Sequence, residues 1–319
     1  MDRRRFMIWA TAALGAAAVG NILGRQYFRV CPVRIFGASD YGKDISKTIL
    51  TGMTEDGISL KGKKILIKPN FVEYHEGRPI NTDPRLLASI VEACKKGGAA
   101  AVTIGEAAGH RRDSFYSVLN PALRKELPRD VRLIDMNYGD VSKIPNKGHF
   151  TRLPEFYVSA ELTRADIVIN VPKMKTHHWV GVTLSMKNLF GTVPGTFYGW
   201  PKNLLHMQGI RNSILDLSVS VPVHYVIIDG IIGMEGDGPI MGGEKKSGLI
   251  LMSKHMLAAD VTAAEIMGFI PEKVEYLSIG SLLHSGFQKK GRSFPWEKPE
   301  RFYTSFKCVE RFSYMKSRT

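Results

Sequence analysis

Short apolar runs alternate with longer helical patterns along the middle of the chain. Six runs rich in β-branched residues predict strands, at residues 64–67, 101–104, 131–134, 166–169, 225–228 and 248–251. These runs contain almost no alternating polar positions, so both faces of each strand should be buried, as in a parallel sheet. Apolar residues at helical spacing predict helices at residues 84–96, 114–126, 204–218 and 256–267. We therefore predict an α/β fold, a doubly wound and mostly parallel sheet with helices on both faces.

The ends of the chain differ in character from its middle. With 319 residues and no internal repeat, the chain can bury a full core as one large domain, which we place at residues 29–285. Residues 1–28 precede it as a signal or N-terminal anchor, and residues 286–319 follow it as a basic, aromatic tail.

The first residues match a twin-arginine export signal. Arg3 and Arg4 precede Phe6 and an uncharged stretch rich in alanine and glycine. We expect the export machinery to recognise them and the protein to work in the periplasm or on the outer face of the cytoplasmic membrane. A small-residue cleavage site at residues 16–18 favours a cleaved form, but the apolar stretch at residues 8–23 is nearly long enough to span a bilayer, which takes about 20 residues. Both a cleaved and an anchored form therefore stay open.

The net charge of +14 would usually suggest nucleic acid or a membrane surface as a partner. Export makes nucleic acid an improbable partner. Much of the excess lies in the tail, where lysines and arginines alternate with aromatic residues. This segment either rests on anionic lipid headgroups or packs on the domain through its aromatic side chains.

Polar side chains follow four of the predicted strands. Lys68 and Asn70 follow the first, Glu106 the second, Asn170 and Lys173 the fourth, and Asp229 the fifth. Because the carboxyl ends of parallel strands meet at one edge of a sheet, we expect these residues to converge on one cleft.

The cleft should be cationic. Lys68, Lys173, Lys175 and Lys187 are candidates to bind a phosphate or carboxylate, and the neighbouring polar residues Asn70, Thr183, Ser185 and Asn188 complete the predicted ligand-binding set. For catalysis the candidates are Lys187, His177, Glu106 and Asp229, because they combine an amine, an imidazole and two carboxylates. His110, which follows a small-residue loop, is a second candidate histidine.

An acidic, glycine-rich loop follows the fifth strand. Asp229, Glu235 and Asp237 offer hard oxygen ligands for a divalent ion such as Mg²⁺, which would bridge them to an anionic substrate. The alternative is that Asp229 and Glu235 neutralise the lysines as a structural ion-pair network. The loop has neither EF-hand nor P-loop spacing.

Several motifs resemble the family of domains of unknown function called DUF362. They are Lys68-Pro-Asn70, Asn81-Thr-Asp-Pro84, Pro172-Lys-Met-Lys-Thr-His177, Ser185-Met-Lys-Asn-Leu-Phe-Gly191 and the run from Asp229 to Pro239. The resemblance implies an association with ferredoxin-like iron–sulfur proteins. The three cysteines have no C-x-x-C spacing, so this chain should bind no iron–sulfur cluster and any cluster should sit on a partner.

Three functions follow from these observations. The first is an exported enzyme that acts on a small anionic molecule, with or without a metal. The second is a redox accessory protein that docks an iron–sulfur partner, and the third is a periplasmic binding protein without catalysis.

Replacing Arg3 and Arg4 together with lysine should leave the protein folded but retained in the cytoplasm, because the paired arginines are the feature that the pathway reads. Cell fractionation measures the outcome. Export of the double variant as efficient as that of the parent would show the signal assignment to be wrong.

Overall fold

The structure is a computed structural model, and it describes residues 30–42, 44–109, 121–284 and 291–317. Arg3, Arg4 and His110 lie outside the described residues. Among the residues that are described, no helix combines the length and the apolar character needed to cross a bilayer.

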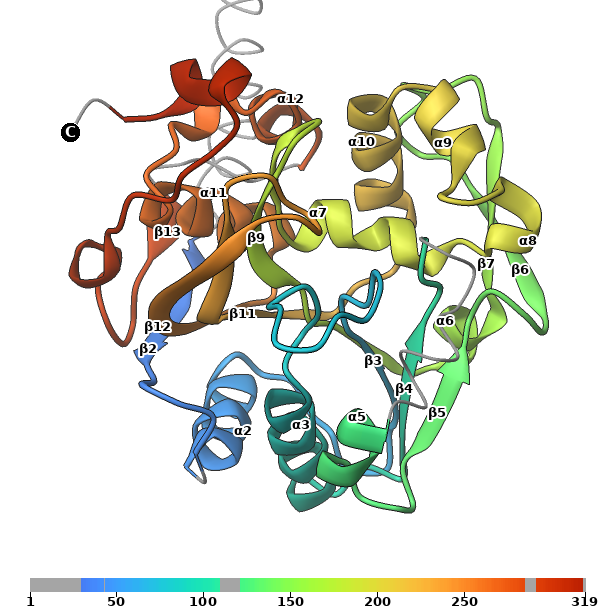
Figure 1. The fold of residues 1–319 in the computed structure, drawn as a ribbon. Coiled ribbons are helices and arrows are strands. Elements are labelled where there is room, and N and C mark those ends of the chain that lie inside the picture. The colour runs from blue at the N-terminus through green and yellow to red at the C-terminus, as the bar shows by residue number, and fades with distance from the viewer. Residues whose placement is uncertain (1–29, 43, 110–120, 285–290, 318–319) are drawn as a thin grey trace, which may run out of the picture.

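A nine-stranded mixed sheet forms the centre of the molecule (Figure 1). Its path runs β10-β9-β11-β8-β3-β4-β5, while β12 pairs with β11 and with β2. The strands are β2 Arg34–Gly37, β3 Lys64–Lys68, β4 Ala101–Glu106, β5 Arg132–Asp135, β8 Ile167–Asn170, β9 Lys173–His177, β10 Gly181–Thr183, β11 Tyr225–Glu235 and β12 Gly243–Ser253. Two small sheets pair β1 Cys31–Pro32 with β13 Arg292–Ser293, and β6 Val141–Pro145 with β7 Glu155–Ser159.

Helices cover both faces of the sheet. In Figure 1 one layer lies below it and contains α2 Ile45–Glu55, α3 Pro84–Lys96 and α5 Pro121–Glu126. The other layer contains α7 Ser185–Asn188, α9 Asn203–Met207, α10 Ile210–Ser220, α11 Met256–Ile266 and α12 Glu275–Leu283. The shorter elements are α6 Ala160–Arg164, α8 Gly195–Tyr198, and the 3₁₀ turns Leu189–Thr192, Pro271–Lys273, Pro299–Phe302 and Glu310–Met315.

Successive residues of the central strands point into two separate hydrophobic cores. Ile65 and Ile67 pack with the helices of the lower layer, whereas Leu66 between them packs with the upper layer. The strands are buried on both faces for this reason, which explains their unbroken apolar sequence. The predicted α/β class, with helices on both faces of one domain, is confirmed.

The sheet departs from the expected parallel pattern at one side. β3, β4, β5, β8 and β11 are parallel to their neighbours, but β12 returns directly from β11 as an antiparallel partner. The polar segment after Asn170 also differs from the expected loop. It forms β9 and β10, a hairpin in which Lys175 lies opposite Thr183.

The ends of two predicted helices show how local sequence sets their bounds. Asp83 caps α3 by accepting a hydrogen bond from Arg85 N at 2.9 Å, and Pro84 takes the first helical position. The helix expected at residues 204–218 is divided into α9 and α10, because Gly209 has φ of 92°. That left-handed conformation suits glycine and ends the first helix there.

The C-terminal segment folds back onto the domain. Phe306, Phe312 and Met315 are buried in the upper core, and Arg292 pairs with Glu265 at 2.7 Å. Packing through aromatic residues is therefore what the structure shows for this part of the chain. Contact with lipid headgroups remains a prediction for its exposed residues, Tyr303 and Tyr314.

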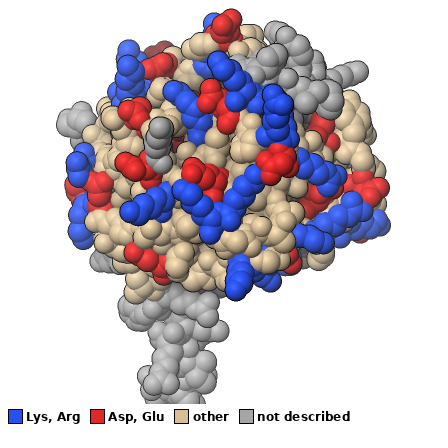
Figure 2. All heavy atoms as spheres, turned by 90° about the horizontal axis from the view of Figure 1, so that it is seen from below, with Lys and Arg blue, Asp and Glu red and all other residues tan. Residues whose placement is uncertain are grey.

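Basic and acidic side chains are interspersed on the face seen from below (Figure 2). At the end of α3, for example, Lys95 pairs with Asp130 and Lys96 with Glu92. The excess of positive charge is therefore not gathered into a single patch on that face.

A buried carboxylate ties α10 to the loop between β6 and β7. Asp216 has no exposed surface and accepts hydrogen bonds from Asn146 Nδ2 at 2.8 Å, Phe150 N at 2.9 Å, Thr151 N at 2.8 Å and Thr151 Oγ1 at 2.7 Å. Four donors would lose their acceptor if this carboxylate were removed.

We expect Asp216→Ala to lower the free energy of unfolding by about 3 kcal/mol or more, because charge-assisted hydrogen bonds are lost and their buried donors stay unpaired. Chemical denaturation measures the change. Asp130→Ala, at a largely exposed ion pair, is the matched control and should cost far less, because water replaces the lost contact. Equal costs for the two variants would contradict this account.

Candidate functional site

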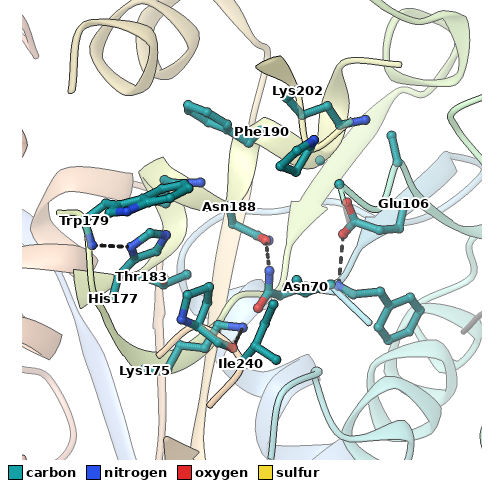
Figure 3. Close-up of a pocket in the computed structure, with 18 of the residues that line it drawn as sticks. Asn70, Glu106, Lys175, His177, Trp179, Thr183, Asn188, Phe190, Lys202 and Ile240 are labelled. Atoms are coloured by element: carbon teal, nitrogen blue, oxygen red, sulfur yellow. Dashed lines mark hydrogen bonds between the residues drawn. The ribbon is translucent and has the colours of Figure 1, made fainter. Parts of the chain in front are cut away.

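A cavity of about 320 Å³ lies beyond the carboxyl ends of β3 and β4, against β9 and β10 (Figure 3). This volume is at the lower end of the range for small-molecule sites. Its walls include seven of the predicted site residues, namely Asn70, Glu106, Lys175, His177, Thr183, Lys187 and Asn188. Of the strand-end residues expected to converge on one cleft, Asn70 and Glu106 line this cavity.

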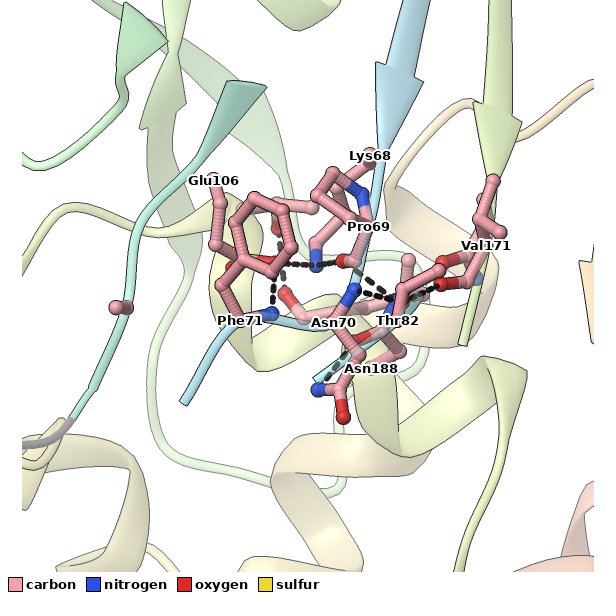
Figure 4. Close-up of polar contacts among 12 residues, drawn as sticks. Lys68, Pro69, Asn70, Phe71, Thr82, Glu106, Val171 and Asn188 are labelled. Carbon is pink, nitrogen blue, oxygen red and sulfur yellow. Dashed lines mark hydrogen bonds and ion pairs between the residues drawn. The ribbon is translucent and has the colours of Figure 1, made fainter. Parts of the chain in front are cut away.

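A buried ion pair forms the base of one wall (Figure 4). Lys68 Nζ lies 2.8 Å from Glu106 Oε2 and also donates to Pro69 O at 2.8 Å. Burial raises the pKa of Glu106, while the Lys68 ammonium opposes this rise. Lys68 is fully buried behind Glu106 and does not line the cavity, so it acts on a ligand only through its partner.

Gly191 is required beside this pair. A Cβ atom at residue 191 would lie 1.6 Å from Glu106 Oε1 and 2.8 Å from Lys68 Nζ. The backbone of residue 191 also accepts a hydrogen bond from Ala107 N at 3.0 Å. The glycine that ends the motif Ser185–Gly191 therefore allows the ion pair to lie directly against the main chain.

Lys187 is the least neutralised of the cavity lysines. It comes from α7, is partly exposed, and its Nζ lies 3.7 Å from the centre of the Phe190 ring. Its amine makes no hydrogen bond or ion pair with any other residue in the described ranges. Burial lowers the pKa of Lys187 to about 7, and the charge of Lys68 acts in the same direction while Glu106 opposes it.

Two further lysines border the cavity with their amines held by oxygens. Lys175 Nζ donates to Ile80 O at 2.8 Å and to Pro239 O at 3.3 Å, and Lys202 Nζ donates to Asn137 Oδ1 at 2.8 Å. Burial lowers the pKa of Lys175 well below its usual range, with Lys173 and Lys187 adding to the effect. Burial also lowers the pKa of Lys202 to about 7.

His177 and His206 face the same cavity as neutral rings. His177 Nδ1 accepts a hydrogen bond from Trp179 N at 3.0 Å, so the proton of the neutral ring lies on Nε2. His206 Nδ1 lies 3.0 Å from Lys202 O and must donate to it, so Nε2 is left as an acceptor. Burial lowers the pKa of both imidazoles.

Four of the residues predicted for ligand binding or catalysis do not line the cavity. Lys173 Nζ pairs with Asp229 Oδ2 at 2.9 Å, and Asp229 also accepts from Tyr41 and from Asp83 N. Ser185 donates from Oγ to Asp260 at 2.6 Å, and the same carboxylate accepts from the backbone of Met186, which fixes the start of α7. Lys68, as described above, is the fourth.

The predicted metal ligands are not brought together. Asp229 is held by Lys173, Glu235 accepts from Lys307 N at 2.9 Å, and Asp237 lies 3.1 Å from His178 Nδ1. In the described part of the chain there is no group of three or more His, Cys, Asp or Glu residues that could hold a metal. Two of these carboxylates lie beside lysines, as in the alternative interpretation: Asp229 beside Lys173, and Glu235 at 3.6 Å from Lys245.

Several residues that line the cavity are not among those predicted from the sequence. They are Trp179, Phe190, Lys202 and His206, together with Phe71, Ala107, Pro201, Pro239 and Ile240. Trp179 and Phe190 lie within the polar segment, where aromatic residues usually indicate core. His206 lies within the single helix predicted at residues 204–218. The sequence signal for a break in that helix is Gly209, which lies between α9 and α10.

The sequence matches DUF362, a domain of unknown function, over residues 65–265, and the chain belongs to this family. It is 26% identical over 250 residues to the thylakoid-associated protein sll1697 of Synechocystis sp.. The alignment covers 75% of this chain and 73% of that protein.

A solved structure of the lactate racemase apoprotein from Thermoanaerobacterium thermosaccharolyticum is also similar, with 15% identity and a TM-score of 0.44. The alignment covers 74% of this chain but spans only 56% of the racemase, so this likeness carries no functional argument.

The reactivity of Lys187 should depend on pH with a midpoint near 7, because its amine is deprotonated above that pH. Competitive acetylation followed by mass spectrometry gives the midpoint for each lysine. Lys61, an exposed lysine, is measured in the same experiment as the reference. A midpoint above 9 for Lys187 would show that burial does not perturb this amine.

Proposed function

We propose that the protein is an enzyme acting on a small anionic molecule, a carboxylate or phosphate, in the cavity around Lys187. The observation that carries the proposal is the position of the Lys187 amine. It borders a cavity of about 320 Å³ and, within the described residues, has no carboxylate partner of its own.

The charge of the cavity supports an anionic ligand. Lys68 and Glu106 neutralise one another, which leaves Lys175, Lys187 and Lys202 without a carboxylate at hydrogen-bond distance in the described structure. An oxyanion about 4 Å from one ammonium gains about 4 kcal/mol at an effective dielectric constant of 20, before the cost of desolvation. A bound anion would also favour the protonated form of Lys187.

The same groups support proton transfer. At pH 7 a lysine with a pKa of about 7 is divided between its two forms, so Lys187 can accept a proton from a ligand or return one. His177 presents an Nε2–H donor that can stabilise negative charge on a ligand oxygen. Glu106 holds Lys68 in place, and Asp229 belongs to a separate ion pair and has no part in this scheme.

We further propose that this chemistry occurs outside the cytoplasm, in the periplasm or on the outer face of the cytoplasmic membrane. The paired arginines at the N-terminus support export, and the Synechocystis relative is described as thylakoid-associated.

A binding protein without catalysis is the second candidate function, because the same cationic cavity would also bind an anion without converting it.

Anion binding should be strongest below pH 7 and should weaken as pH rises above 7, because the bound anion raises the pKa of Lys187 and binding takes up a proton. The affinity should fall by up to about tenfold per pH unit until the pKa of the bound state is reached. A thermal-shift screen of phosphorylated and carboxylated metabolites, followed by calorimetry of hits between pH 6 and 9, measures this.

Lys187→Met should weaken binding by at least about tenfold and reduce the pH dependence to the part that comes from Lys202, whereas Lys61→Met, at an exposed lysine, should change neither. A parent protein that binds no anion, or a Lys187→Met variant that binds as the parent does, would refute the proposal. Binding without conversion of any hit would favour the non-catalytic alternative.

A further inference from the structure

Three asparagines form a chain of amides behind the cavity. Asn70 Nδ2 donates to Asn188 Oδ1 at 2.8 Å, Asn188 Nδ2 donates to Asn170 Oδ1 at 2.7 Å, and Asn170 Nδ2 donates to Ser185 O at 2.8 Å. These residues come from the loop after β3, from α7 and from the end of β8. Figures 3 and 4 show the link between Asn70 and Asn188.

The chain of amides fixes which atom of the Asn70 amide is left without a hydrogen bond. Ser185 O can only accept, so Asn170 must present Nδ2 to it and Oδ1 to Asn188. Asn188 Nδ2 donates to that oxygen and to Pro69 O at 3.0 Å, which leaves its Oδ1 for Asn70. Asn70 must therefore use Nδ2 within the chain, and its Oδ1 is left as an acceptor.

That acceptor has no partner among the described residues. Asn70 is 92% buried and Thr183 96% buried, since their exposures are 8% and 4%, and Asn70 Oδ1 and Thr183 Oγ1 are both unpartnered within the described chain. Both residues line the cavity. A buried acceptor without a hydrogen bond costs about 1–3 kcal/mol, so a ligand that donates to it is favoured over one that does not.

The chemical type of the donor follows from the surrounding charge. An ammonium group would be repelled by Lys175, Lys187 and Lys202, and the carboxylate of Glu106 is already paired with Lys68. A hydroxyl group donates a hydrogen bond without adding charge, and it can also accept one from Thr183 Oγ1.

We infer that the ligand of this cavity is a hydroxylated anion, a hydroxy-carboxylate or a hydroxyalkyl phosphate, whose hydroxyl group donates to Asn70 Oδ1 while its anionic group lies against Lys187. This inference rests on the proposed function and narrows its substrate class. A site built to pair with a hydroxyl group discriminates strongly against analogues that lack it, because the buried acceptor is then left unpaired.

The test compares anions that differ in their hydroxyl groups. Calorimetry at pH 6.5 would measure 3-hydroxybutyrate and 2-hydroxybutyrate against butyrate, and glycerol 3-phosphate against propyl phosphate. In at least one series the hydroxylated probe should bind at least about tenfold more tightly, and the series that does so identifies the anionic group. Equal affinities within both series, lost in Lys187→Met, would overturn this inference and leave the anion-binding proposal standing.

Variants locate the contact. Asn70→Ala should abolish the preference for the hydroxylated probe and leave the affinity for the analogue without a hydroxyl group unchanged. Thr183→Val should reduce this preference less than Asn70→Ala does. A preference that survives unchanged in a folded Asn70→Ala protein would overturn the assignment to Asn70. The comparison on the parent protein decides the hydroxyl preference without any variant, and a parent that binds none of the probes would overturn both proposals.

Discussion

The ion pair between Lys68 and Glu106 is the contact on which the site depends. It joins the ends of β3 and β4 in the centre of the sheet, and both side chains are withdrawn from solvent. Removing one partner from such a pair costs about 3–5 kcal/mol, because the other charge is left buried and alone. The absence of a side chain at Gly191 lets the turn after α7 lie against this pair, so the position of Lys187 depends on it as well.

Burial gives the cavity its chemical character. A lysine in water is almost fully charged at neutral pH, and surface lysines of this chain pair with carboxylates such as Asp130 and Glu92. Lys187 instead lies over an aromatic ring, with a second lysine nearby and one carboxylate to offset them. The fold thus keeps cationic groups in a place where they are poorly solvated and incompletely neutralised, which is the condition under which an amine can exchange protons near pH 7.

The sequence predicted the parts of the fold that follow from apolar periodicity. The strand at residues 64–67 and the helix at residues 84–96 are found with bounds that differ by one residue at most. β9 was not predicted, because its residues Lys173 and Lys175 are charged and buried charges are rare in strands. Their tertiary partners explain why these lysines can be buried. Lys173 pairs with Asp229, and Lys175 donates to two carbonyl oxygens.

The same limit applies to the site. Strand ends indicated Asn70 and Glu106 correctly as neighbours of one cavity, since parallel topology alone brings them together. Topology could not show that Asp229 faces Lys173, because β11 pairs first with β8 and then with β9 and so carries that carboxylate away from the cavity. Nor could it show His206, which reaches the cavity because one glycine separates two helices.

The packed domain extends beyond the residues that the family model matches. The family match covers residues 65–265, yet β2, which pairs with β12, precedes that range, and Phe306 and Phe312, which complete the upper core, follow it. The stretch that the family model matches is therefore smaller than the stretch that packs together. A chain cut at residues 65 and 265 would expose one edge of the sheet and part of a hydrophobic core, so the limits of the family match are not the limits of the packed domain.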